Sequence, residues 1–176
     1  LFGGAPTSRR DVVVAIGWAC FVMVVAVVWR TPVVPTDPWY YVQSTLEFPS
    51  TGWVPLGFTR YGIILATIPP ALLFGNAEAT YYFWPLVSSG VMAAMLYLVG
   101  RRLFGPLAGG VSVVLTVGYP IVFAHLTRGY PDVMSVAILL SAVFCALSAR
   151  DRGLRGRAEI GWLLATGFLL GWGFEV

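Results

Sequence analysis

Residues 61–74 read YGIILATIPPALLF, an apolar stretch interrupted by Pro69 and Pro70. A helix needs about 20 apolar residues to cross the hydrocarbon core of a bilayer, so this stretch is short for a span. A proline inside a helix also removes a backbone hydrogen bond. The segment is either a weak span or a helix lying in the membrane interface, and the choice decides the topology of every element that follows it.

The chain around this stretch has the composition of a membrane protein. Of its residues, 58% are hydrophobic and only 11% are charged, against about 25% charged in an ordinary soluble domain. The apolar residues fall in long runs rather than in the periodic stripes of a soluble core. The sequence therefore predicts an all-α integral membrane protein, a helical bundle of several spans, and excludes a soluble globular fold.

Several apolar runs approach the length of a full span. We expect one transmembrane domain with spans over residues 12–29, 80–100, 107–124, 133–149 and 160–176, the last of them cut off by the end of the sequence. The sequence begins without methionine and stops inside an apolar run, so we expect it to be part of a longer polypeptide.

Arginine clusters decide how residues 61–74 are placed. All eleven basic residues are arginines, a bias typical of a high-GC bacterial genome such as that of an actinomycete. Clusters stand at Arg9 and Arg10, at Arg101 and Arg102, and in residues 150–157. If residues 61–74 do not cross, all three clusters share one side, as the positive-inside rule requires. We therefore interpret residues 61–74 as an outer-face juxtamembrane or re-entrant helix.

On this topology, polar residues gather in two outer loops, residues 30–79 and 125–132. An interfacial aromatic belt explains most of the aromatic residues there. It does not explain Asp37 and Asp132, because an acid near membrane depth is costly unless it is paired, caps a helix or has a function. Both aspartates also fit helix N-caps. His125, the single histidine, also fits an ordinary interface residue.

The sequence lacks the motifs of several common enzyme classes. No HExxH, CxxC, Walker or GxGxxG motif occurs, so zinc hydrolase, redox, P-loop and dinucleotide-binding functions are unsupported. No metal site and no cofactor are predicted, and the sequence leaves open whether a divalent metal takes part. Cys20 and Cys145 lie in apolar runs and are interpreted as small hydrophobes. Close helix packing is predicted at glycines in LAGG (107–110) and at 167, 171 and 173.

Five motifs, taken in order, resemble the N-terminal part of GT-C glycosyltransferases: TDPWYY, TRYGIILATIPPALLFG, YLVGRRLFGP, TRGYPD and GFLLGWGFEV. The likeness is to polyprenyl-phosphate-sugar-dependent protein mannosyltransferases and to aminoarabinose transferases of lipid A. It implies a multi-pass plasma-membrane enzyme with its active side outward. Such an enzyme moves a sugar from a polyprenyl-phosphate donor to a protein, glycan or lipid acceptor, with inversion of the anomeric centre.

The resemblance also implies roles for individual residues. Catalytic roles fall on Asp37, as the base that takes the acceptor's proton, and on Asp132, which would orient acceptor or sugar beside Arg128 and Tyr130. Arg60 would hold the donor's phosphate through a bidentate fork. The family's Asp-Glu pair in the first outer loop is Asp-Pro here, which argues against a paired-carboxylate or metal role. The other expected substrate-binding residues are Tyr40, Tyr41, His125 and Glu47, although Glu47 also fits a solvated loop charge.

A non-enzymatic membrane protein is the alternative, either part of a transporter or flippase or a structural subunit of a complex. Transporters usually place ionisable groups and broken helices near the membrane midplane. Here the acids collect at one end of the spans, which favours the enzyme. The expected partners are a lipid-linked sugar donor, an acceptor and membrane lipids, and a net charge of +3 that is scattered along the chain does not suggest nucleic acid. The oligomeric state is left open.

The charge bias yields a topology that cysteine labelling can test. In a variant with Cys20 and Cys145 replaced by alanine, we expect single cysteines in residues 30–79 and 125–132 to react with a membrane-impermeant thiol reagent in intact cells. Cysteines at positions 101 and 155 should resist it. Labelling of position 101 from outside would show that residues 61–74 cross the membrane, and Asp132 would then lie on the inner side.

Overall fold

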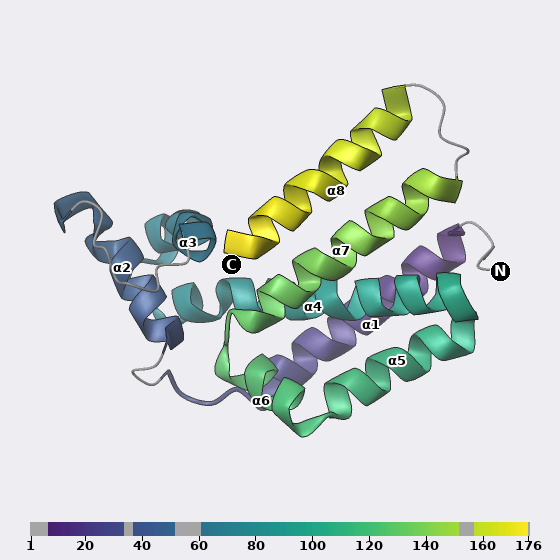
Figure 1. Ribbon diagram of the computed structural model, residues 1–176. Helices are drawn as coiled ribbons and strands as arrows, with labels where there is room; N and C mark the ends of the chain where they lie inside the picture. Colours follow the sequence, from purple (N-terminus) through teal and green to yellow (C-terminus); the bar gives the residue numbers. More distant parts are fainter. Residues whose placement is uncertain (1–6, 34–36, 52–60, 152–156, 176) are drawn as a thin grey trace.

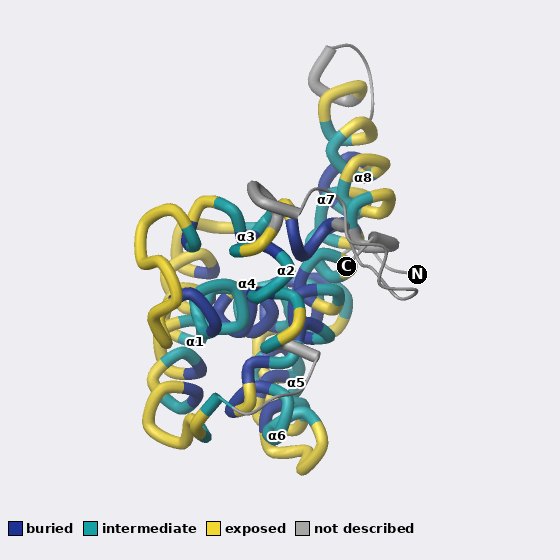
Figure 2. Tube along the Cα trace, turned by 90° about the vertical axis from the view of Figure 1, so that its left-hand side faces the viewer, coloured by how far each residue is buried: buried dark blue, intermediate teal, exposed yellow. Residues whose placement is uncertain are grey.

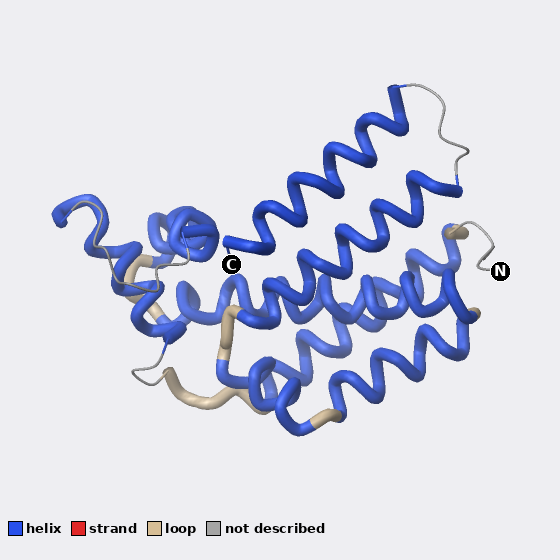
Figure 3. The backbone as a smooth tube through the Cα atoms, viewed as in Figure 1, coloured by secondary structure: helices blue, strands red, loops and turns tan. Residues whose placement is uncertain are grey.

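The computed structural model describes residues 7–33, 37–51, 61–151 and 157–175, and within them all regular structure is helical (Figure 3). The prediction of an all-α membrane bundle is confirmed. The helices are α1 (Arg9–Val28), α2 (Asp37–Thr51), α3 (Tyr61–Phe74), α4 (Glu78–Phe104), α5 (Pro106–Gly118), α6 (Pro120–Arg128), α7 (Asp132–Asp151) and α8 (Arg157–Glu175).

Three of these helices, α1, α4 and α7, are long and apolar enough to cross a membrane. The expected continuous span 107–124 is instead divided into α5 and α6, which are bent by 73° relative to each other. Pro120 explains the break, because proline lacks a backbone N–H and disfavours the helical conformation of the residue before it. In α8, the apolar stretch Ile160–Trp172 is shorter than a full span.

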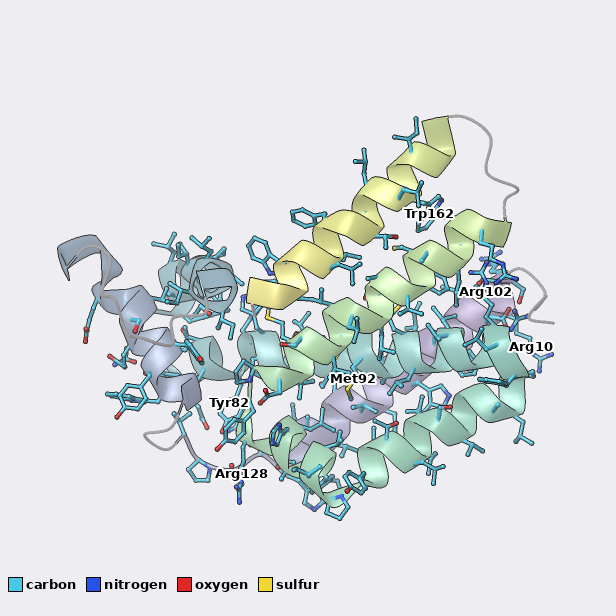
Figure 4. The ribbon with its side chains drawn as sticks, in the orientation of Figure 1. Arg10, Tyr82, Met92, Arg102, Arg128 and Trp162 are labelled. Carbon is cyan, nitrogen blue, oxygen red and sulfur yellow. The ribbon has the colours of Figure 1, made fainter. Side chains whose placement is uncertain are left out.

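Helix α4 occupies the centre of the bundle and packs against α1, α5 and α7, while α8 lies along α7 (Figure 1). The main core is apolar and includes Met92, which is 1% exposed and lies mid-bundle in Figure 4. Figure 2 shows the buried residues facing the interior and exposed residues on the outer surfaces of α1, α5 and α8. Many of the exposed residues are large and apolar, as expected of helices that face lipid.

Arginines join three helices at one end of this bundle. Ser8 and Asp11 form a capping box at the start of α1, and the Asp11 carboxylate lies 2.8 Å from Arg101 Nε at the end of α4. Arg102 is buried, donates to Ser148 Oγ at 2.8 Å and stands over the ring of Phe144. These contacts fix the ends of α1, α4 and α7 together.

A glycine contact brings α4 and α5 close to each other. A Cβ atom added at Gly109 would come within 2.6 Å of the Tyr97 carbonyl oxygen, closer than real Cβ atoms approach. The close packing predicted for the LAGG motif is thus confirmed at Gly109. Among the described residues no such packing is found at Gly167 and Gly171, where an added Cβ would meet no atom within 4 Å. The surroundings of Gly173 lie outside the described part of the chain.

At the opposite end of the bundle, α3 runs across the direction of the long helices and is seen nearly end-on in Figure 1. Its bounds, Tyr61–Phe74, coincide with the apolar segment predicted as one helix, and both prolines lie inside it. The N–H that Pro70 lacks would normally bond the carbonyl of Ala66, four residues earlier. In its place, the indole Nε1 of Trp84 on α4 donates to that carbonyl.

The Trp84 hydrogen bond can be tested by Trp84→Phe, which keeps an aromatic ring and removes the donor. Because the Ala66 carbonyl would lose its partner, we expect a loss of about 1–3 kcal/mol in the free energy of unfolding, measured by reversible unfolding in detergent. Trp18→Phe in α1, where the ring packs edge-to-face against Phe21, is the matched control. If both substitutions lowered the free energy of unfolding equally, Trp84 would not be the hydrogen-bond partner that the Ala66 carbonyl needs.

Candidate functional site

The two ends of the bundle differ in chemistry. Figure 4 shows Arg10 and Arg102 at one end and Tyr82 and Arg128 at the other. At the second end lie α2, α3, α6 and the start of α7, which carry the site residues predicted from the sequence and described in the structure. This polar end is the candidate site.

The turn between α6 and α7 gathers three of the predicted residues. Gly129 adopts φ 72°, a left-handed conformation that ends α6 and that glycine adopts readily. The chain then reverses, the ring of Tyr130 stacks on His125 with centroids 4.9 Å apart, and the Asp132 carboxylate lies 3.3 Å from His125 Nδ1. His125 and Asp132 are only partly exposed, at 33% and 49% of their side chains.

The segment after α1 is tied to this turn by hydrogen bonds. The Thr31 N–H and Oγ1 both donate to the Thr127 carbonyl, at 3.0 and 3.4 Å. The Tyr82 hydroxyl on α4 in turn donates to the Thr31 carbonyl. The start of the first predicted outer loop therefore lies against the second. Thr31 and Thr127 were not predicted from the sequence, since no local pattern signals a contact between residues so far apart in the chain.

Helix α2 is held beside α3 and α4. Gln43 Nε2 donates to the Tyr81 hydroxyl at 2.6 Å and to Asn76 Oδ1 at 3.2 Å, and the Tyr81 hydroxyl donates to the same Asn76 oxygen. Thr45 Oγ1 donates to the Ile64 carbonyl of α3 at 3.3 Å. These bonds fix α2, which begins at Asp37, against the polar end of the bundle.

The other predicted residues are distributed around this end. Tyr41 lines a cavity of about 30 Å³ with Trp84 and Met134, room for about one water molecule. Tyr40 and Glu47 on α2 are exposed, as is Arg128 at the end of α6. The side chain of Asp37 and the whole of Arg60 lie outside the described residues.

The His125 and Asp132 side chains border a second cavity of about 160 Å³ between α4, α5, α6 and α7, whose other lining residues are mainly apolar. A carboxylate held by an imidazole can accept a hydrogen bond from a hydroxyl group, and the apolar wall strengthens such a contact by excluding water. Among the residues described, no group of three or more His, Cys, Asp or Glu could hold a metal ion.

The chain is similar to a known protein family. Residues 66–176 match the family model described as dolichyl-phosphate-mannose-protein mannosyltransferase. The match begins inside α3 and covers α4 to α8, so it includes His125, Tyr130 and Asp132 but neither Asp37 nor Arg60. No curated protein and no solved structure matches the chain.

Proposed function

The chain belongs to the dolichyl-phosphate-mannose-protein mannosyltransferase family, and from this premise we propose that it moves a sugar from a polyprenyl-phosphate donor to an acceptor on the outer face of the membrane. Membership in the family makes it a membrane glycosyltransferase of the GT-C kind. The proposed donor and the proposed transfer on the outer face go beyond family membership. The observation that supports them is the grouping of His125, Tyr130 and Asp132 at the end of the bundle opposite the arginine cluster.

The reaction is a single displacement at the sugar. The acceptor's hydroxyl oxygen attacks the anomeric carbon while the bond from that carbon to the donor's phosphate oxygen breaks. The polyprenyl phosphate leaves with the electron pair, and the acceptor's proton passes to a carboxylate base. Because attack and departure take place on opposite faces of the carbon, the anomeric configuration inverts.

Each charge in this step needs a partner on the protein. The leaving phosphate needs a cation rather than a general acid, and an arginine provides a bidentate charge-assisted contact; we assign this role to Arg60. The acceptor hydroxyl needs a carboxylate within hydrogen-bond reach. We assign that role to Asp37, which begins a helix anchored to α4 through Gln43 and Tyr81.

Asp132 serves to orient the acceptor or the sugar. Its carboxylate is held by His125, which fixes its direction, and the Tyr130 ring stacks on that imidazole. Arg128, exposed at the end of α6, precedes this group in the chain. Tyr40 on α2 is exposed and offers a ring on which a sugar can stack, whereas Tyr41 lines the small cavity beside Trp84. The acceptor itself is a hydroxyl-bearing protein, glycan or lipid.

Asp37→Asn separates catalysis from helix capping, because asparagine caps helices about as well as aspartate. If Asp37 takes the proton, transfer by the full-length protein should fall by about 10²- to 10⁴-fold, with unfolding and donor binding close to wild type. Asp132→Asn, assayed in parallel, should raise the acceptor's KM more than it lowers kcat. Wild-type transfer by Asp37→Asn together with a collapse of kcat in Asp132→Asn would move the base to Asp132.

A further inference from the structure

A groove that the proposed reaction does not use lies on the lipid-facing side of the bundle. Its volume is about 260 Å³, and α1, α3, α4 and α6 all contribute to its wall. The lining is apolar apart from Arg30 and Tyr82: Ala26, Val27, Phe74, Ala79, Phe83, Leu86 and Leu126 complete it. It is smaller than the roughly 300–1000 Å³ of pockets for drug-sized ligands, and this size suits a segment of one hydrocarbon chain.

The mouth of this groove carries one charge of each sign. Arg30 follows the end of α1, Glu78 opens α4, and Arg30 Nη2 lies 3.4 Å from Glu78 Oε2, with both side chains about half exposed. From Glu78 to Leu86, α4 rises about 12 Å. The groove therefore runs from a charged mouth at the helix ends toward the depth of the acyl chains.

Exposed apolar residues connect the groove to the bilayer. Leu72 and Leu73 at the end of α3 are 82% and 75% exposed. Phe74 follows them, lines the groove and contacts the ring of Phe83. Apolar side chains that project in this way beside a membrane-spanning helix are stabilised by lipid rather than by water, so a membrane lipid has direct access to the groove.

We propose that this groove binds a phospholipid with a zwitterionic, primary-ammonium headgroup, of the phosphatidylethanolamine class, with one acyl chain in the apolar slot. Arg30 binds the phosphate, and Glu78 accepts a hydrogen bond from the ammonium group. A purely anionic lipid satisfies Arg30 but brings its charge against Glu78, which disfavours it. The exposed Arg30–Glu78 pair is weak, so the headgroup displaces it at small cost.

Native mass spectrometry of the delipidated full-length protein, given equal amounts of phosphatidylethanolamine and phosphatidylglycerol with the same acyl chains, tests the headgroup. We expect the ethanolamine lipid to be bound in about two- to fivefold excess, the range that one exposed ion pair supports. Glu78→Gln should abolish or reverse this excess. Arg10→Gln, a charge change at the opposite end of the bundle, should leave it as in wild type.

Filling the groove tests the chain site separately. Ala79 is exposed on α4 and lines the groove, so Ala79→Leu should reduce bound lipid with little effect on folding, whereas Ala79→Ser should not. Equal binding of the two lipids by wild type, an excess unchanged by Glu78→Gln, or full lipid binding by Ala79→Leu would each overturn the proposal. None of these measurements depends on sugar transfer, so their outcome is independent of the proposed reaction.

Discussion

A backbone carbonyl that is buried without a backbone donor needs another hydrogen-bond partner, and side chains in the first turns of α4 supply three of them. Trp84 bonds the Ala66 carbonyl that a proline leaves free. Tyr82 bonds the Thr31 carbonyl beyond α1. Thr80 bonds the Gly75 carbonyl in the preceding turn at 2.7 Å. Three neighbouring side chains of one helix thus fix both the transverse helix α3 and the segment after α1.

The polar end depends on this arrangement because its parts come from distant stretches of the chain. At the other end, Asp11 pairs with Arg101 and Arg102 reaches Ser148, so the arginines from which the inner side was predicted also join the long helices. With both ends fixed, His125 and Asp132 meet at the end opposite Arg101 and Arg102. The arginine cluster at one end predicts the direction of the bundle across the membrane, and the proposed chemistry requires that direction.

Features set by local sequence were predictable, and features set by distant contacts were not. The segment YGIILATIPPALLF predicted the helix now seen over Tyr61–Phe74, because the apolar run and the residues that flank it are enough to mark the bounds of that helix. The break between α5 and α6 at Pro120 was not predicted, because the apolar run around it was interpreted as one span. The bonds from Thr31 to Thr127 join residues 96 positions apart. The assigned roles of Asp37 and Arg60 rest on the sequence, since their side chains lie outside the described residues.

We propose that this GT-C glycosyltransferase transfers sugar at the end of the bundle opposite its arginine cluster, on the outer face. Transfer from a polyprenyl-phosphate sugar to a membrane-impermeant acceptor, compared between sealed right-side-out and inverted vesicles containing the full-length protein, tests that claim most directly. If transfer takes place on the outer face, right-side-out vesicles should form product, and inverted vesicles should do so only after permeabilisation. Product from sealed inverted vesicles at the same rate, or from them alone, would contradict it.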